Sequence, residues 1–159
     1  MAMKSQLKCG QKNYPVRIEM PRIVVMARWP SPNRCKQRLK HDLKHCAGMG
    51  HAGESAMRIQ RELTLHTARV VASMETTHHI TATLAVEGLG PKAARRWGEQ
   101  LGLTRGNLQG TGNLGCRMKR QLLLRQSNEL STLFIGTDLP DLNSNDLQSA
   151  ITSLQSHDL

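Results

Sequence analysis

A continuous run of apolar residues, Ile23-Val24-Val25-Met26-Ala27, places the strongest constraint on how this chain can fold. Such a short run, rich in β-branched side chains, is typical of a strand that is buried on both faces of a parallel sheet. The segment 133–136 has the same character, and the segment 79–86 alternates apolar and polar residues as a strand does. The sequence therefore predicts three strands.

Helical patterns lie between and after these strands. We expect helices over about 35–46, 54–74, 91–101, 113–126 and 143–154. Pro91 suits the first position of its helix, and Asn143 or Ser144 suits the cap of the last one. The segment 105–112 is expected to be a glycine-rich loop. The order β-α-α-β-α-α-β-α predicts an α/β fold, a Rossmann-like and mostly parallel sheet with flanking helices. In such sheets ligands bind at the carboxyl ends of the strands.

Length and charge bound the organisation of the chain and its partners. Its 159 residues fit one domain, which we expect over 20–159, and the polar, basic segment 1–19 is expected to be a disordered tail. A net charge of +10 favours anionic partners. No run approaches the roughly 20 apolar residues of a membrane span. Four cysteines without C-x-x-C spacing, in a chain with no signal peptide, favour the cytoplasm.

The loop after the first strand is stiffened by prolines and then becomes basic. Arg34, Lys36 and Arg38 lie at or just before the beginning of a predicted helix, where backbone N–H groups already favour an anion. Three cations there make a phosphate cradle, and arginine can contact phosphate through two parallel hydrogen bonds. The alternative is an ordinary basic loop followed by a solvated helical turn.

A second motif, at 109–118, brings glycines up to another predicted helix. Glycine lets the backbone approach a ligand closely, and Asn113 either caps the helix or contacts that ligand. Arg117 lies in the first turn of the helix. On its own this motif also fits a plain loop that leads into a helix.

A third motif follows the last predicted strand. Asp138 stands directly after the strand, where a carboxylate is a natural ligand for Mg²⁺ or Mn²⁺ that also bridges substrate phosphates. Asp141 is a weaker candidate, because it either assists the metal or caps the next helix.

Together the three motifs resemble those of the bacterial GT-A-type glycosyltransferases assigned to arsenosugar biosynthesis. The family pattern has R-x-K-T-R-L after the first strand, G-D-L-G-x-R-M at a helix start, and I-G-T-D-x-P-x-L at a strand end. The corresponding segments here are 34–39, 113–118 and 135–142, in the same order. The resemblance spans roughly residues 23–159.

The resemblance implies a nucleotide-diphospho-sugar donor at the carboxyl edge of the sheet. By this analogy Arg34, Lys36 and Arg38 contact the diphosphate, and the loop from Gly112 to Arg117, with Asn113, borders the nucleoside. Asp138 then binds a divalent metal ion that neutralises the departing diphosphate. The acceptor is not implied, because its contacts lie mainly outside the resembling motifs.

The chain also departs from the family pattern. Gln37 replaces the usual Thr, Asn113 replaces an Asp, and Asn33 replaces a Gly whose left-handed conformation Asn can adopt. The family continues into a further strand and an E-D-G-G-Y-type loop, so we expect a C-terminally truncated fold with reduced activity. Such a fold would leave a sheet edge uncovered, through which the chain could self-associate.

Three other functions remain open at this point. A nucleotidyltransferase would use a similar phosphate loop and metal carboxylate, but would direct attack at the α-phosphate. A non-catalytic remnant could retain nucleotide binding. A basic nucleic-acid-binding protein is disfavoured, because one Phe, one Tyr and two Trp offer no stacking platform and no DNA-binding motif is present.

Overall fold

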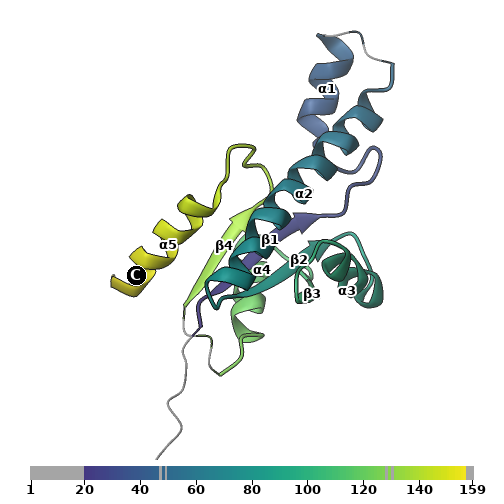
Figure 1. The fold of residues 1–159 in the computed structure, drawn as a ribbon. Coiled ribbons are helices and arrows are strands. Elements are labelled where there is room, and N and C mark those ends of the chain that lie inside the picture. The colour runs from purple at the N-terminus through teal and green to yellow at the C-terminus, as the bar shows by residue number, and fades with distance from the viewer. Residues whose placement is uncertain (1–19, 47, 49, 128, 130, 157–159) are drawn as a thin grey trace, which may run out of the picture.

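The computed structural model describes residues 20–46, 48, 50–127, 129 and 131–156 (Figure 1). Within them four parallel strands form one sheet in the order β3-β2-β1-β4. The elements are β1 (Arg22–Arg28), α1 (Gln37–His45), α2 (Ala52–Thr77), β2 (Thr81–Glu87), α3 (Pro91–Gln100), β3 (Arg105–Leu108), α4 (Leu114–Leu123), β4 (Thr132–Gly136) and α5 (Ser144–Ser156).

The strand β1 lies in the interior of the sheet, as its apolar sequence predicts. It pairs with β2 on one side and with β4 on the other, from Arg22 opposite Thr81 and Thr132. Ile23, Val24 and Val25 are fully buried. Burial on both faces explains why the run is continuous rather than alternating.

The two faces of the sheet are covered differently. Ile23 and Val25 of β1 join a hydrophobic core with Val71 of α2, Ala94 of α3 and Leu147 of α5. Adjacent residues of a strand point to opposite faces. On the opposite face α4 packs, and Figure 1 shows this helix across the sheet from α2.

The contacts of α4 with the sheet are mostly polar. Arg22 Nη1 donates to the carbonyl of Gln121 at 2.8 Å, and Gln121 Nε2 donates to the carbonyl of Leu108 at 2.8 Å. Leu123 at the end of this helix is 76 % exposed. The helix is therefore held to the sheet by hydrogen bonds more than by apolar packing.

A buried ion pair joins the amino ends of the strands. Glu129, 1 % exposed, lies 3.7 Å from Arg22 Nε, accepts from the hydroxyl of Thr81 at 2.8 Å, and pairs with Arg105. Burial raises the pKa of Glu129, but hydrogen bonds from Gln126 N–H, Thr81 and Arg105 outweigh it, so the pKa lies below its ordinary value. The carboxylate thus stays charged and ties β1, β2 and β3 together.

The α/β fold and the three predicted strands are confirmed, and the five predicted helices are present with boundaries shifted by a few residues. The prediction of a loop over 105–112 is wrong, because residues 105–108 form β3. This strand lies at the sheet edge and contains one large apolar residue, Leu108, so its own sequence carries almost no strand signal. Pairing with β2, from Arg105 opposite Thr83 to Leu108 opposite Val86, determines its conformation.

Two further predictions concern the N-terminal segment and the absence of a membrane span. The proposed tail at 1–19 lies outside the described residues. Among the helices that the structure describes, none is long and apolar enough to cross a membrane.

The close approach of α3 to β3 predicts a specific sensitivity. A Cβ on Gly106 would overlap the carbonyl oxygen of Ala94 and lie 2.8 Å from the Cα of Arg95, both backbone atoms that cannot move aside. We expect Gly106→Ala to lower the free energy of unfolding by about 1–3 kcal/mol, measured by urea denaturation. Gly115→Ala in α4, which has only an ordinary contact 3.6 Å away, should be neutral or stabilising. Equal effects of the two substitutions would contradict this packing.

Candidate functional site

The carboxyl ends of all four strands meet at one edge, and two cavities open there. The first has a volume of about 370 Å³ and the second of about 400 Å³. Arg28, the last residue of β1, lines both. The second cavity lies where β1 and β4 are neighbours, which is the point where the strand order reverses. Crevices at such points are where open α/β sheets bind ligands.

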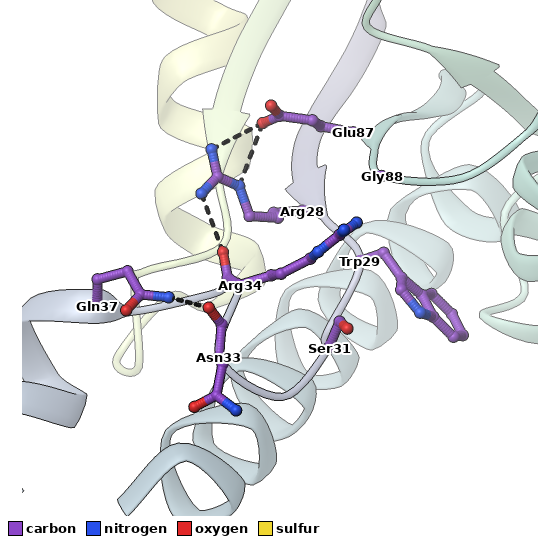
Figure 2. A pocket seen from close by; sticks show the side chains of 8 residues that line it. All are labelled: Arg28, Trp29, Ser31, Asn33, Arg34, Gln37, Glu87 and Gly88. Atoms are coloured by element: carbon purple, nitrogen blue, oxygen red, sulfur yellow. Dashed lines mark hydrogen bonds and ion pairs between the residues drawn. The ribbon is translucent and has the colours of Figure 1, made fainter.

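The first cavity is organised around an arginine–glutamate pair (Figure 2). Arg28 and Glu87 are register partners at the ends of β1 and β2, and Arg28 Nη2 lies 2.9 Å from Glu87 Oε2. Arg28 Nη1 also donates to the carbonyl of Arg34 at 3.2 Å. The residues that line this cavity are Arg28, Trp29, Ser31, Asn33, Arg34, Gln37, Glu87 and Gly88.

Glu87 is held from a second direction by Arg117 of α4. Arg117 Nη1 lies 2.8 Å from Glu87 Oε2, and Arg117 Nε donates to the carbonyl of Gly112 at 2.9 Å. The hydrogen bond from Arg117 lowers the pKa of Glu87, and the hydrogen bond and charge of Arg28 add to this against the opposing effect of burial. The carboxylate therefore joins β1, β2 and α4.

Trp29 lines the first cavity and belongs to an aromatic pair. The rings of Trp29 and Trp97 are 4.9 Å apart at 83°, an edge-to-face arrangement that aromatic rings prefer. Trp97 of α3 is 9 % exposed, so the pair anchors the loop after β1 to the core. These are the chain's two tryptophans, which makes their fluorescence a reporter for this cavity.

The second cavity contains an ion pair of opposite charges from distant segments. Lys36 Nζ lies 2.9 Å from Asp138 Oδ1, with side-chain exposures of 14 % and 71 %. Lys36 precedes α1 and has a left-handed φ of 44°, which turns the chain there. Asp138 follows β4 by two residues. The cavity thus offers one cation and one carboxylate beside Arg28.

Three buried polar side chains complete the lining of the second cavity. Gln60 of α2 donates to the hydroxyl of Thr137 at 3.0 Å, and both residues are 5 % exposed. Gln109 after β3 donates to the carbonyls of Ala27 and Ala85 at 2.9 and 3.0 Å. These contacts fix the strand ends on which the cavity is built.

The structure brings some of the predicted site residues together and leaves others apart. Lys36 and Asp138 line the second cavity, and Arg34 lines the first. In Figure 2 the Arg34 guanidinium points away from Gln37, toward the side of the cavity that Arg28 and Trp29 line.

The remaining predicted residues lie outside the two cavities. Arg38 is exposed on α1 and lines neither. Asn113 caps α4, accepting from the N–H of Cys116 at 2.9 Å, and Arg117 reaches the site through Glu87. Asp141 lines a separate hollow of about 330 Å³ beside α5.

Arg28, Glu87, Gln60 and Gln109 were missed by sequence reasoning. Arg28 was assigned to a loop, and Gln109 lay in the motif at 109–118 without a role of its own. No local pattern distinguishes Glu87 and Gln60 from surface polar residues. Their contacts join positions as far apart as 82 residues for Gln109 and 59 for Arg28. The one available signal was position, because Arg28 and Glu87 each stand just after a predicted strand, whereas Gln109 follows β3, which the sequence did not predict.

To bind a metal ion here, the protein's side chains would need further coordinating groups from a bound substrate or from water. Among the residues that the structure describes, no three His, Cys, Asp or Glu side chains are grouped to hold one. Asp138 presents a single, largely exposed carboxylate. This fits the way Mg²⁺ commonly binds, through one or two carboxylates, water and substrate phosphates.

Comparison with known proteins gives a family and a fold. A family model for DUF2064, described as an uncharacterized protein conserved in bacteria, matches residues 70–159, more than half of the chain. No curated protein matches the chain.

A solved structure matches with a TM-score of 0.65 and 19 % sequence identity. It is that of a candidate nucleotide-diphospho-sugar transferase from Desulfovibrio desulfuricans G20. The match covers 88 % of this chain and 56 % of that one, so the chain spans little more than half the length of the protein it resembles. At this identity the match shows a shared fold.

The contacts of Glu87 predict a pH-dependent contribution to stability. A carboxyl with a lowered pKa stabilises the folded state above its ordinary pKa of 4.5, and this is lost as pH falls through the folded-state value. We expect Glu87→Gln to lower the free energy of unfolding by about 1 kcal/mol at pH 7, after allowance for partial exposure. The deficit relative to wild type should shrink in urea titrations below pH 4.5.

The exposed Glu99 of α3 provides the control for this substitution. Glu99→Gln should change stability by less than about 0.5 kcal/mol at every pH. A Glu87→Gln deficit that stays constant down to pH 2 would show that the carboxylate's charge is not what Arg28 and Arg117 recognise.

Proposed function

The chain belongs to the DUF2064 family of proteins conserved in bacteria, and we propose that it binds a nucleotide-diphospho-sugar donor as a GT-A-type glycosyltransferase does. The observation that carries this proposal is the Lys36–Asp138 pair at 2.9 Å, at the point where the strand order reverses. The resemblance of the three sequence motifs to the glycosyltransferases assigned to arsenosugar biosynthesis supports glycosyl transfer as the reaction.

The two cavities suit the two ends of such a donor. The first offers the Trp29 wall and the neutral side chains of Ser31 and Asn33, as a nucleoside requires. The second offers Lys36, Asp138 and uncharged hydrogen-bonding groups, as a sugar diphosphate requires. Arg28 lines both, so a ligand that spans them passes over its guanidinium.

The diphosphate would be neutralised by cations of the loop before α1. Lys36 is the nearest to Asp138, and Arg34 has no side-chain partner among the residues that the structure describes. Asp138 would hold a divalent metal ion together with the donor's phosphates, and that ion would supply Lewis-acid stabilisation of the leaving group. Asp141, in its own hollow, is the weaker metal ligand of the proposal.

The loop before α4 would border the nucleoside, as the resemblance implies. Asn113 is engaged as a helix cap, so its contribution would be to shape the loop. Arg117 would act through Glu87, which it holds against the first cavity. Arg38, exposed on α1, would add to the positive field that attracts the donor rather than contact the bound diphosphate.

Because the attacked atom distinguishes the reactions, product analysis separates glycosyl transfer from nucleotidyl transfer. Glycosyl transfer breaks the bond between the sugar carbon and the diphosphate and releases a nucleoside diphosphate. Nucleotidyl transfer would place a nucleoside monophosphate on the acceptor. Donor binding with neither product would identify a non-catalytic nucleotide-binding protein.

Donor binding predicts a defined role for the charge of Lys36. We expect UDP or GDP, or a sugar conjugate of one of them, to change tryptophan fluorescence and to bind in calorimetry more tightly with Mn²⁺. Lys36→Met should weaken this binding by about tenfold or more, because a charge-assisted phosphate contact is lost. Lys44→Met, on the exposed face of α1, changes the net charge equally and should have little effect.

Asp138→Asn tests the metal ion separately. It should abolish the gain in affinity that Mn²⁺ gives while nucleotide binding without metal persists. If no nucleotide binds to the folded wild-type protein, or if Lys44→Met weakens binding as much as Lys36→Met, the proposed donor site is wrong.

A further inference from the structure

A buried hydrogen-bond chain runs from the interior of α2 into the second cavity. The buried positions of α2 are otherwise small or apolar in its first half, with Ala52, Ala56 and Gln60 following each other at intervals of four residues. Gln60 is therefore the one long polar side chain on this part of the buried stripe. Burying an amide in place of a methyl or methylene group is costly unless its hydrogen bonds are made.

The hydrogen bonds of Gln60 hold it in one orientation. Its Nε2 donates to Thr64 Oγ1 at 3.2 Å and to Thr137 Oγ1 at 3.0 Å, and the Thr64 hydroxyl donates to the backbone carbonyl of Gln60 at 2.8 Å. Both amide protons are thus used on hydroxyl oxygens. The Thr137 oxygen accepts, so its own proton stays available as a donor.

Gln60 and Thr137 differ in chemistry from the charged residues of the same cavity. Gln60 and Thr137 line the same cavity as Lys36 and Asp138, but carry no charge. A cation and a carboxylate serve phosphate and metal, whereas an amide oxygen and a hydroxyl proton suit the hydroxyl groups of a neutral ligand. The part of the cavity at Gln60 and Thr137 is therefore chemically suited to hydroxyl groups.

We propose that Gln60, held by Thr64 and paired with Thr137, is the specificity-determining residue that recognises hydroxyl groups of the sugar in the second cavity. This inference rests on the proposed function, since it assigns one half of the donor to one half of the site. It adds that affinity for the sugar, as distinct from the nucleoside diphosphate, depends on an amide from α2 rather than on the charged loops.

The test compares one nucleoside diphosphate with its own sugar conjugate. Calorimetry and tryptophan fluorescence would measure both ligands on wild type and on Gln60→Met, which keeps the length of the side chain and removes its hydrogen bonds. We expect the sugar conjugate to lose about three- to tenfold in affinity while the nucleoside diphosphate binds as in wild type. The measured quantity is the affinity for the sugar conjugate divided by the affinity for the nucleoside diphosphate.

Two further variants separate recognition from a general loosening of the helix. Thr67→Val changes a fully buried polar residue of α2 that does not line the cavity, and should leave the ratio unchanged. Thr137→Val should lower the ratio, and the double variant Gln60→Met with Thr137→Val should lose less than the product of the two single effects, because the two residues act as a pair.

The outcomes distinguish this inference from the donor site as a whole. If nucleoside diphosphates bind and Gln60→Met weakens both ligands equally, or neither, the assignment of Gln60 is wrong while the donor site stands. If neither ligand binds to the folded wild type, the donor site and this inference fall together. If Gln60→Met does not fold, Thr137→Val decides, since an unchanged ratio in that variant overturns the proposal.

Discussion

The carboxylate of Glu87 is the contact on which the carboxyl edge of the sheet depends. It receives Arg28 from the neighbouring strand and Arg117 from the helix on the opposite face of the sheet from the apolar core. Arg28 in turn holds the carbonyl of Arg34, and Arg117 holds the carbonyl of Gly112. One anion therefore fixes two of the three loops that the sequence motifs single out. The pairing of two cations with one partly exposed carboxylate also leaves a net positive charge there, which favours an anionic ligand.

The opposite edge of the sheet uses the same arrangement for a different purpose. Glu129 also lies between two arginines, Arg22 and Arg105, but there the carboxylate and Arg22 are almost fully buried. Charges removed from water in this way are costly to separate. They also offer no surface that a ligand could reach. At the carboxyl edge Arg28 is half exposed and borders two cavities. Similar chemistry thus supports stability at one end of the strands and an accessible site at the other.

Sequence reasoning reached the parts of this structure in which local pattern and burial coincide. The strand β1 is apolar along its length because both of its faces are covered. Asp138 was recognised because it closely follows β4, whose apolar sequence also predicted a strand, although β4 is only partly buried. The strand β3 was missed because its conformation is determined by β2 and by the space that Gly106 leaves for α3. Glu87 and Gln60 were missed because a polar residue acquires its role from partners 30 to 77 residues away, which no spacing rule reveals.

The Lys36–Asp138 pair links the second cavity to the proposed ligand by charge balance. Each partner neutralises the other at 2.9 Å, so the cavity presents no unpaired charge at this point. On binding a donor, Lys36 would exchange a carboxylate for a phosphate, and Asp138 would exchange an ammonium for a divalent cation. Each residue would thus keep a partner of opposite charge, and neither charge would be left uncompensated in the cavity. Phosphate without a cation would release Asp138 and a cation without phosphate would release Lys36, which is the physical reason to expect the two to bind cooperatively.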